Sequence, residues 1–313
     1  MKTLVKLLFV IAFLGMLTNC AKDEIIDEGA NELKSAIPPT VNKAQGLDQD
    51  RFVMIDELNL KVHYRIIGKG PVDIVFIPGW TNPLTVYTKQ FDYFREKARC
   101  IYIDLPGHGL SDAPENIEYT MGLMADAIYT VVKKEGLHKF AAVGFSWGSS
   151  PLTQFEIRHP GMITQLILLD IGIPTWPPLT DASRNATYEA NLNMTPGNKS
   201  VALNGLIPQV TAPEDLKEWG NYFLDFPNWL LANMYYHYQA KEVCQPYQWT
   251  VPVNVIYRIM APNSPKETRT KLFFPNCAIS VIGGDQHCIQ WAYPETVNQM
   301  MSDFLIDRPG KKY

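Results

Sequence analysis

The stretch Phe140-Ala-Ala-Val-Gly144-Phe-Ser146-Trp-Gly148 decides the fold of this 313-residue chain. Its apolar start is typical of a buried strand, and the pattern at Pro151–Arg158 is typical of a helix. Between them stands G-x-S-x-G, which places a serine on a sharp turn from strand to helix. The glycines fit this turn because a side chain at either position would collide with the neighbouring strand or helix. The stretch therefore predicts a strand–turn–helix unit with Ser146 at its apex.

Strand and helix patterns alternate on both sides of this unit. Most of the apolar runs lack the in/out alternation of a half-exposed strand, as expected for parallel strands covered on both faces. Helical patterns such as Met121–Lys134 lie between them, and Phe52–Asp56 and Lys61–Ile67 predict an antiparallel entry hairpin. This order predicts an α/β fold with a doubly wound, mostly parallel sheet of about eight strands. The predicted buried strands are Asp73–Ile77, Ile101–Ile103, Phe140–Val143, Gln165–Leu169, Val253–Tyr257 and Ala278–Ile282.

One interval between strands is much longer than the others. Roughly 80 residues separate Asp170 from Val253, and loops of that length without secondary structure are uncommon. Aromatic residues recur there at helical spacing, so we expect a helical cap inserted after the sixth strand. The predicted organisation is a signal peptide over 1–20, a polar tether over 21–50, a core over 51–170 and 251–313, and a cap over 171–250.

Composition and charge exclude several classes of protein. Hydrophobic residues at 46% and charged residues at 19% are typical of a globular chain and exclude wholesale disorder. With 28 basic against 32 acidic side chains, no positive surplus is left to bind a phosphate backbone, so nucleic acid is not an expected partner. No Cys/His spacing indicates a metal site, and we expect no cofactor. Past Cys20, the cysteines are expected to be buried thiols, with disulfides as the alternative: Cys100, Cys244, Cys277 and Cys288.

The first twenty residues have the pattern of an export signal. Lys2 and Lys6 precede the apolar run Leu7–Leu17, which is shorter than the about 20 residues that span a bilayer. Leu17-Thr18-Asn19-Cys20 resembles the lipobox of bacterial lipoproteins, although Asn19 departs from the usual small residue. The resemblance implies lipidation of Cys20 and a place in the cell envelope, anchored to the outer membrane on its periplasmic or surface-exposed face. An ordinary signal peptide or an uncleaved apolar tail is the alternative.

In its strand–helix context, the G-x-S-x-G motif resembles that of the α/β-hydrolases, and the resemblance extends over about residues 51–307. It implies that Ser146 is a nucleophile. Ile77-Pro78-Gly79-Trp80 takes the place of the family's His-Gly loop, so the backbone N–H groups of Trp80 and Trp147 would form an oxyanion hole. Asp104-Leu-Pro-Gly107-His-Gly109-Leu-Ser111 resembles the family's D-x-x-G-x-G-x-S loop, which shapes the fold. His108 and Asp104 are therefore not assigned to catalysis.

The resemblance also implies a base and an acid. Ile282-Gly283-Gly284-Asp285-Gln286-His287 is similar to the family's loop after the last strand, which makes His287 the base. The acid commonly follows the seventh strand, but no acidic residue occurs there before Glu267. Asp170 closes the sixth strand, a position that some members of the family use, and is the predicted acid. Asp285 or a carboxylate from the cap is the alternative.

A serine nucleophile with a histidine base and an aspartate implies hydrolysis of a small acyl substrate through an acyl-enzyme. Carboxylic esters are the expected substrates, with thioesters, lactones and small amides open. Dehalogenase and epoxide-hydrolase chemistry in this fold needs an aspartate nucleophile, so Ser146 disfavours both. The Ser146-Trp147 pair resembles that of proline iminopeptidases, but their His-Gly-Gly-Pro-Gly loop is missing. A lipoprotein that keeps the fold only to bind a ligand is the alternative from another class.

Overall fold

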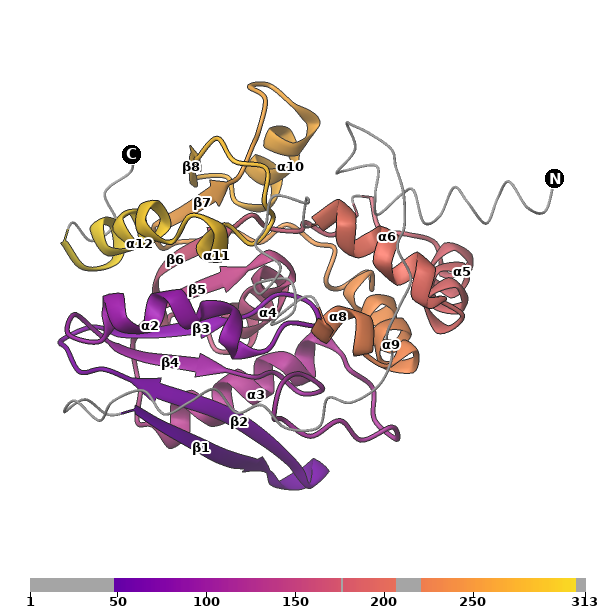
Figure 1. Cartoon of the computed structure of the whole chain (residues 1–313), viewed down its shortest axis with the longest axis horizontal. Coiled ribbons are helices and arrows are strands. Elements are labelled where there is room, and N and C mark those ends of the chain that lie inside the picture. The colour runs from indigo at the N-terminus through magenta and orange to yellow at the C-terminus, as the bar shows by residue number, and fades with distance from the viewer. Residues whose placement is uncertain (1–47, 176, 207–220, 308–313) are drawn as a thin grey trace.

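The computed structural model describes residues 48–175, 177–206 and 221–307. Within these ranges, an eight-stranded sheet has the order β1-β2-β4-β3-β5-β6-β7-β8 (Figure 1). β2 pairs antiparallel with β1 and β4, and the other neighbours are parallel. This architecture confirms the predicted fold class. The strands are β1 Asp48–Ile55, β2 Leu60–Ile67, β3 Asp73–Ile77, β4 Arg99–Ile103, β5 Phe140–Phe145, β6 Ile163–Leu169, β7 Val253–Tyr257 and β8 Ala278–Val281.

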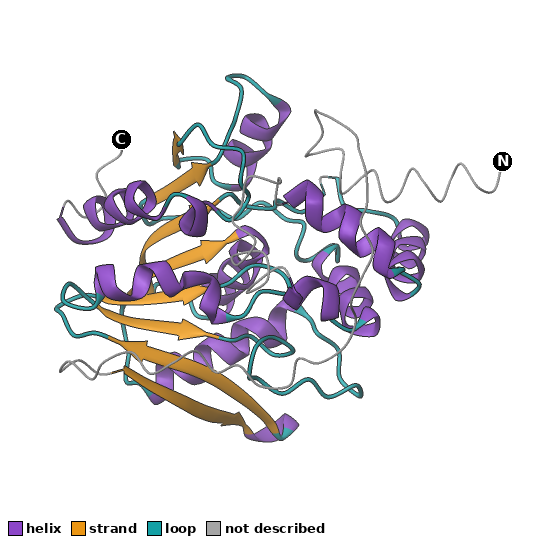
Figure 2. Ribbon diagram, in the orientation of Figure 1, coloured by secondary structure: helices purple, strands orange, loops and turns teal. Residues whose placement is uncertain are grey.

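Helices cover both faces of the sheet, which is why its central strands are mainly apolar. Every residue of β5 is buried. Figures 1 and 2 show α2, α11 and α12 in front of the sheet and α3 and α4 behind it. The bounds of these helices are α2 Thr88–Phe94, α3 Met121–Lys134, α4 Ser149–Arg158, α11 Ile289–Ala292 and α12 Pro294–Ser302.

Local sequence signals fix several of these elements. β3, β7 and α3 have the predicted bounds. α3 begins where the Thr120 hydroxyl accepts a hydrogen bond from the Leu123 N–H, and lysines in its last turn suit the negative end of the helix dipole.

β1 begins at Asp48, whereas the sequence assigns residues 48–50 to the tether. The charged start of this edge strand has no apolar alternation, and only its pairing with β2 as far as Ile67 defines it.

The long interval after β6 is mainly helical in its described part. The helices contact one another as the pairs α5–α9 and α6–α8, and Figure 1 shows them beside the ends toward which the parallel strands point. The Trp80 ring, just past β3, lies 6.1 Å from Phe223 and 5.7 Å from Tyr235 in this insertion. The helices are α5 Asp181–Leu192, α6 Pro196–Leu206, α8 Asn221–Asp225 and α9 Asn228–Tyr238. Their position agrees with the predicted cap.

The predicted signal peptide, with Cys20 and most of the tether, lies outside the described residues. Across the ranges that are described, no helix has the length and apolar character needed to span a bilayer. Cys100, Cys244 and Cys288 are buried thiols, as predicted. Cys277 is partly exposed, contrary to expectation, because the strand that follows it, β8, lies at the edge of the sheet.

Candidate active site

Ser146 occupies a strained turn between β5 and α4. Its φ of 51° lies in the left-handed region that non-glycine residues seldom adopt. The glycines that flank it allow close packing: a Cβ on Gly148 would lie 2.5 Å from the Pro78 carbonyl oxygen, and one on Gly144 would lie 2.9 Å from Leu152. The turn is therefore held against the end of β3 and the first turns of α4, with its serine at the apex.

The structure brings Ser146, His287 and Asp170 together. His287 Nε2 lies 2.9 Å from Ser146 Oγ, and His287 Nδ1 lies 2.7 Å from Asp170 Oδ2. Because a carboxylate only accepts hydrogen bonds, Nδ1 carries the proton and Nε2 accepts the serine hydroxyl. The imidazole also packs on Phe145, with ring centroids 4.9 Å apart. Three residues from three distant parts of the sequence thus form one continuous hydrogen-bonded chain.

Asp170 is buried, and its surroundings keep it ionised. Only 2% of the residue is exposed, and its φ of 37° turns the chain sharply at the end of β6. Burial favours the neutral carboxyl, but the hydrogen bond from His287 and the charges of Lys266 and Arg258 outweigh it and lower the pKa of Asp170. The carboxylate is therefore available as an acceptor for the Nδ1 proton at neutral pH.

Two cations beside Asp170 were not predicted from the sequence. Arg258, the first residue after β7, places Nε 3.3 Å from Asp170 Oδ2. Lys266, in α10 (Pro265–Phe273), places Nζ 3.4 Å from Oδ1. They lie 88 and 96 residues from Asp170 along the chain, so no local pattern connects them. The available signal was Arg258 itself, a charge that directly follows a mostly apolar strand.

The alternative acid Asp285 and Glu267, the first acidic residue after β7, have other partners. The Asp285 carboxylate accepts a hydrogen bond from the Tyr293 hydroxyl at 3.1 Å. Glu267 accepts from the Asn263 N–H and pairs with Lys271. The Nδ1 atom of His287 is directed at Asp170 instead, which is the geometry expected of the predicted acid.

The two predicted oxyanion donors belong to segments that pack against each other. Trp147 follows Ser146 directly in the turn, and Trp80 follows the Pro78-Gly79 segment, whose Pro78 carbonyl closely approaches Gly148. The segments that carry the two tryptophans thus meet at the turn of Ser146, and their role as an oxyanion hole stays a prediction.

The loop after β4 has a buried polar network of its own. The Asp104 carboxylate accepts hydrogen bonds from the backbone N–H groups of Leu84 and Leu110 and lies 2.8 Å from His63 Nδ1. His108 is 1% exposed, and its Nδ1 donates to the Pro106 carbonyl at 3.1 Å. Its ring packs 5.6 Å from both Trp147 and Phe226. The loop thus packs against the serine turn through His108 and Trp147, in line with the structural role expected of it.

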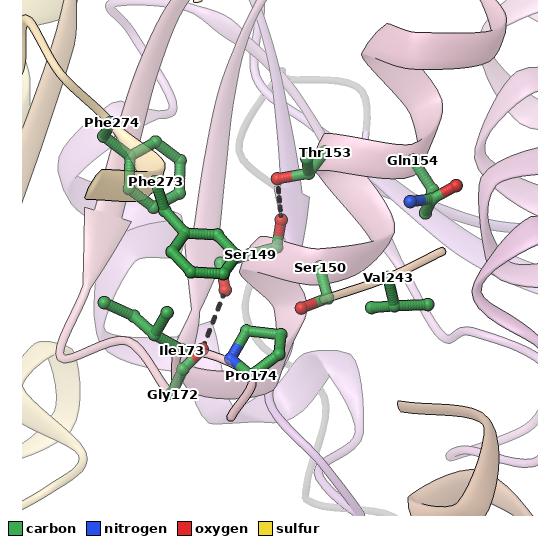
Figure 3. Close-up of a pocket in the computed structure, with 10 residues that line it drawn as sticks. All are labelled: Ser149, Ser150, Thr153, Gln154, Gly172, Ile173, Pro174, Val243, Phe273 and Phe274. Carbon is green, nitrogen blue, oxygen red and sulfur yellow. Dashed lines mark hydrogen bonds between the residues drawn. The ribbon is translucent and has the colours of Figure 1, made fainter. Parts of the chain in front are cut away.

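A pocket borders the segments that follow Ser146 and Asp170 without including either residue. Figure 3 shows Ser149 directed toward the Gly172 carbonyl, and Phe273 and Pro174 also line the pocket. Nowhere in residues 48–175, 177–206 and 221–307 do three or more His, Cys, Asp or Glu side chains form a group able to hold a metal ion.

Residues 74–237, more than half of the chain, match the family model described as alpha/beta hydrolase fold. The chain belongs to this family. Among curated relatives, it is similar to protein ABHD8 of Bos taurus, with 26% identity over 250 residues, and to epoxide hydrolase 3 of Xenopus tropicalis, with 27% over 130. These matches cover 77% and 41% of this chain but only 58% and 35% of the respective relatives.

Solved structures of hydrolases share the fold. A hydrolase from Pseudomonas aeruginosa PA01 aligns with a TM-score of 0.71 at 15% identity, covering 82% of this chain and 98% of that one. A thermophilic esterase from Thermogutta terrifontis aligns with a TM-score of 0.68 at 20% identity, covering 83% and 98%. At these identities, the likeness establishes a shared alpha/beta hydrolase fold.

Burial of His108 makes the folded protein sensitive to acid. Burial lowers the pKa of His108 to about 4, against about 6.5 for an exposed imidazole. The unfolded chain therefore takes up a proton at this residue between these pH values while the folded chain does not, so acidification favours unfolding. Between pH 7 and pH 4, we expect the free energy of unfolding to fall by up to about 3 kcal/mol less in His108→Asn than in the wild type. The asparagine keeps a donor near the Nδ1 position. Urea unfolding of both proteins across this range measures the difference; equal pH dependence would contradict the assignment.

Proposed function

We propose that this protein is a serine hydrolase that cleaves carboxylic esters or related acyl substrates through an acyl-enzyme. The observation that carries the proposal is the hydrogen-bonded chain from Ser146 through His287 to the ionised Asp170. A strained serine turn and a base oriented by a buried carboxylate are what nucleophilic catalysis by a hydroxyl requires.

In the proposed reaction, Ser146 Oγ attacks the acyl carbonyl carbon while His287 Nε2 takes the hydroxyl proton. The N–H groups of Trp80 and Trp147 donate hydrogen bonds that stabilise the negative charge developing on the carbonyl oxygen. The imidazolium, stabilised by Asp170, then protonates the departing alcohol as the carbon–oxygen bond breaks. A water molecule, deprotonated by His287, attacks the acyl-enzyme. The imidazolium then returns the proton to Ser146 Oγ as the bond from Oγ to the acyl carbon breaks, which releases the carboxylic acid and free Ser146.

The serine nucleophile distinguishes the proposed activity from epoxide hydrolysis, the activity for which some of the relatives are named. Epoxide opening in this fold uses an aspartate as nucleophile, and this chain has Ser146 at the corresponding turn. A hydroxyl nucleophile suits a carbonyl substrate, from which it forms an ester that water can hydrolyse. The choice among esters, lactones, thioesters and small amides depends on the cleft and the cap.

Ser146→Ala should abolish turnover without unfolding the protein. The change removes the proposed nucleophile while leaving a small side chain on the turn. We expect a loss of at least about a thousandfold in the hydrolysis of short p-nitrophenyl esters, with an unchanged melting temperature. The wild type should also react covalently with a fluorophosphonate at Ser146. A wild type that neither labels nor turns over any of these esters would instead favour a ligand-binding module.

Asp170→Asn and Asp285→Asn together test the identity of the acid. Asparagine keeps the shape of Asp170 but removes the charge that stabilises the imidazolium and selects the Nδ1–H tautomer. We expect Asp170→Asn to lower kcat at least about a hundredfold. Asp285→Asn should stay near the wild type, because that carboxylate contacts Tyr293 at the surface. The opposite ranking of the two variants would assign the role to Asp285.

We also propose that the hydrolase domain is anchored to a membrane by a lipid on Cys20. The support is the sequence pattern of Lys2, Lys6, the apolar run Leu7–Leu17 and the lipobox-like Leu17-Thr18-Asn19-Cys20. Cys20→Ala should move the protein from the membrane fraction to the soluble fraction or leave the precursor uncleaved. Fractionation and mass spectrometry of the mature N-terminus measure this. A wild type that is already soluble and carries no lipid would disprove the anchor.

A further inference from the structure

Arg258 links two parts of the candidate site that lie far apart in the sequence, Asp170 and the loop that carries His287. On one side, its Nε lies 3.3 Å from Asp170 Oδ2, and its backbone N–H donates to Oδ1 at 3.3 Å. On the other side, its Nη1 donates to the Asp285 carbonyl at 2.8 Å. Asp285 lies two residues before His287, so a single side chain contacts both the acid and the loop that carries the base.

The backbone of Arg258 reinforces this link. Its carbonyl oxygen accepts hydrogen bonds from the N–H groups of Gly283 and Gly284, at 3.0 and 2.9 Å. The His287 loop is therefore attached to Arg258 at three points, two through the backbone and one through the guanidinium. The residue is only 7% exposed, so these bonds are shielded from competing water.

The guanidinium and His287 Nδ1 both approach the same oxygen of Asp170. Oδ2 accepts the Nδ1–H group of His287 at 2.7 Å and forms an ion pair with Nε of Arg258 at 3.3 Å. The backbone N–H of Arg258 also donates to Oδ1, so the carboxylate cannot rotate without losing one of these contacts, and Arg258 restricts the position of the atom on which the imidazole depends. A change of about 1 Å in such an arrangement can lower a rate by about a hundredfold.

We infer that Arg258 is a positioning residue for the Ser146–His287–Asp170 site, fixing the acid and the histidine loop relative to each other. The inference rests on the proposed hydrolase function and adds a residue to it that does not touch the substrate. The fork of the guanidinium is essential to this role, because Nε pairs with the Asp170 carboxylate while Nη1 donates to the Asp285 carbonyl on another segment. A lysine at this position keeps the charge but offers one nitrogen in place of two.

Lys266 provides a matched comparison. Its Nζ lies 3.4 Å from Asp170 Oδ1, similar to the distance of Arg258 from the same carboxylate, and 38% of its side chain is exposed. In the described contacts, its ammonium binds Asp170 and lies 4.0 Å over the Tyr257 ring. Lys266→Met therefore removes a positive charge from the acid while leaving the attachment of the histidine loop to Arg258 in place.

The experiment compares Arg258→Ala, Arg258→Met, Arg258→Lys and Lys266→Met. Fluorophosphonate titration first counts active sites, so that kcat is expressed per labelled serine and unfolded protein is not scored as slow enzyme. We expect each Arg258 variant to lose at least about tenfold in kcat with little change in KM, and Lys266→Met to lose less. Guanidinium, at concentrations too low to shift the unfolding transition, should restore part of the kcat of Arg258→Ala, while sodium chloride at equal ionic strength should not.

A second readout does not depend on turnover. The Nδ1 proton of His287, held on Asp170, should give a resolved low-field proton resonance in the wild type. We expect that resonance to shift or broaden in Arg258→Lys and to persist in Lys266→Met. The inference would be overturned if Arg258→Met kept a kcat per labelled site within tenfold of the wild type. It would also be overturned if guanidinium restored no more of the kcat of Arg258→Ala than sodium chloride does. An unchanged proton resonance in Arg258→Lys would separately overturn the positioning role. If the wild type neither reacts with the fluorophosphonate nor hydrolyses an ester, the hydrolase proposal fails instead.

Discussion

The buried negative charge of Asp170 is the constraint on which the rest of the site depends. A carboxylate removed from water is costly unless donors replace its hydration. Here the replacements come from three places: the imidazole of His287, the backbone and guanidinium of Arg258, and the ammonium of Lys266. Each donor lies on a different segment, so satisfying this one charge brings together the ends of β6 and β7, the start of α10 and the loop after β8.

The serine turn imposes a second requirement, which the packing of the sheet meets. The positive φ of Ser146 is unfavourable by itself and persists because the surrounding structure leaves no alternative. The turn packs against the end of β3 at Pro78, and the buried ring of His108 packs against Trp147 in the same turn. Parallel strands end at the same edge of a sheet, so the strain at β5 and the charge at β6 lie side by side.

The helices inserted between β6 and β7 stand over this edge. Their aromatic side chains contact the loops that bear the proposed oxyanion donors: Phe223 and Tyr235 pack on Trp80, and Phe226 packs on His108 beside Trp147. A change in the position of these helices would therefore alter the surroundings of the serine without moving the strands. In this family, such an insertion can vary the substrate while the sheet maintains the reacting groups.

The sequence by itself determined the order of strands and helices, because buried strands and amphipathic helices have distinct periods that a local stretch displays. It also located Ser146 and His287, since the turn before α4 and the loop after β8 have local patterns. Asp170 could be inferred only by its position at a strand end, and the charged start of β1 was not recognisable without its partner strand. The tertiary structure alone decided that Arg258 and Lys266 surround Asp170. Such contacts join residues many tens of positions apart, and they arise from the need to neutralise a buried charge, which no local periodicity records.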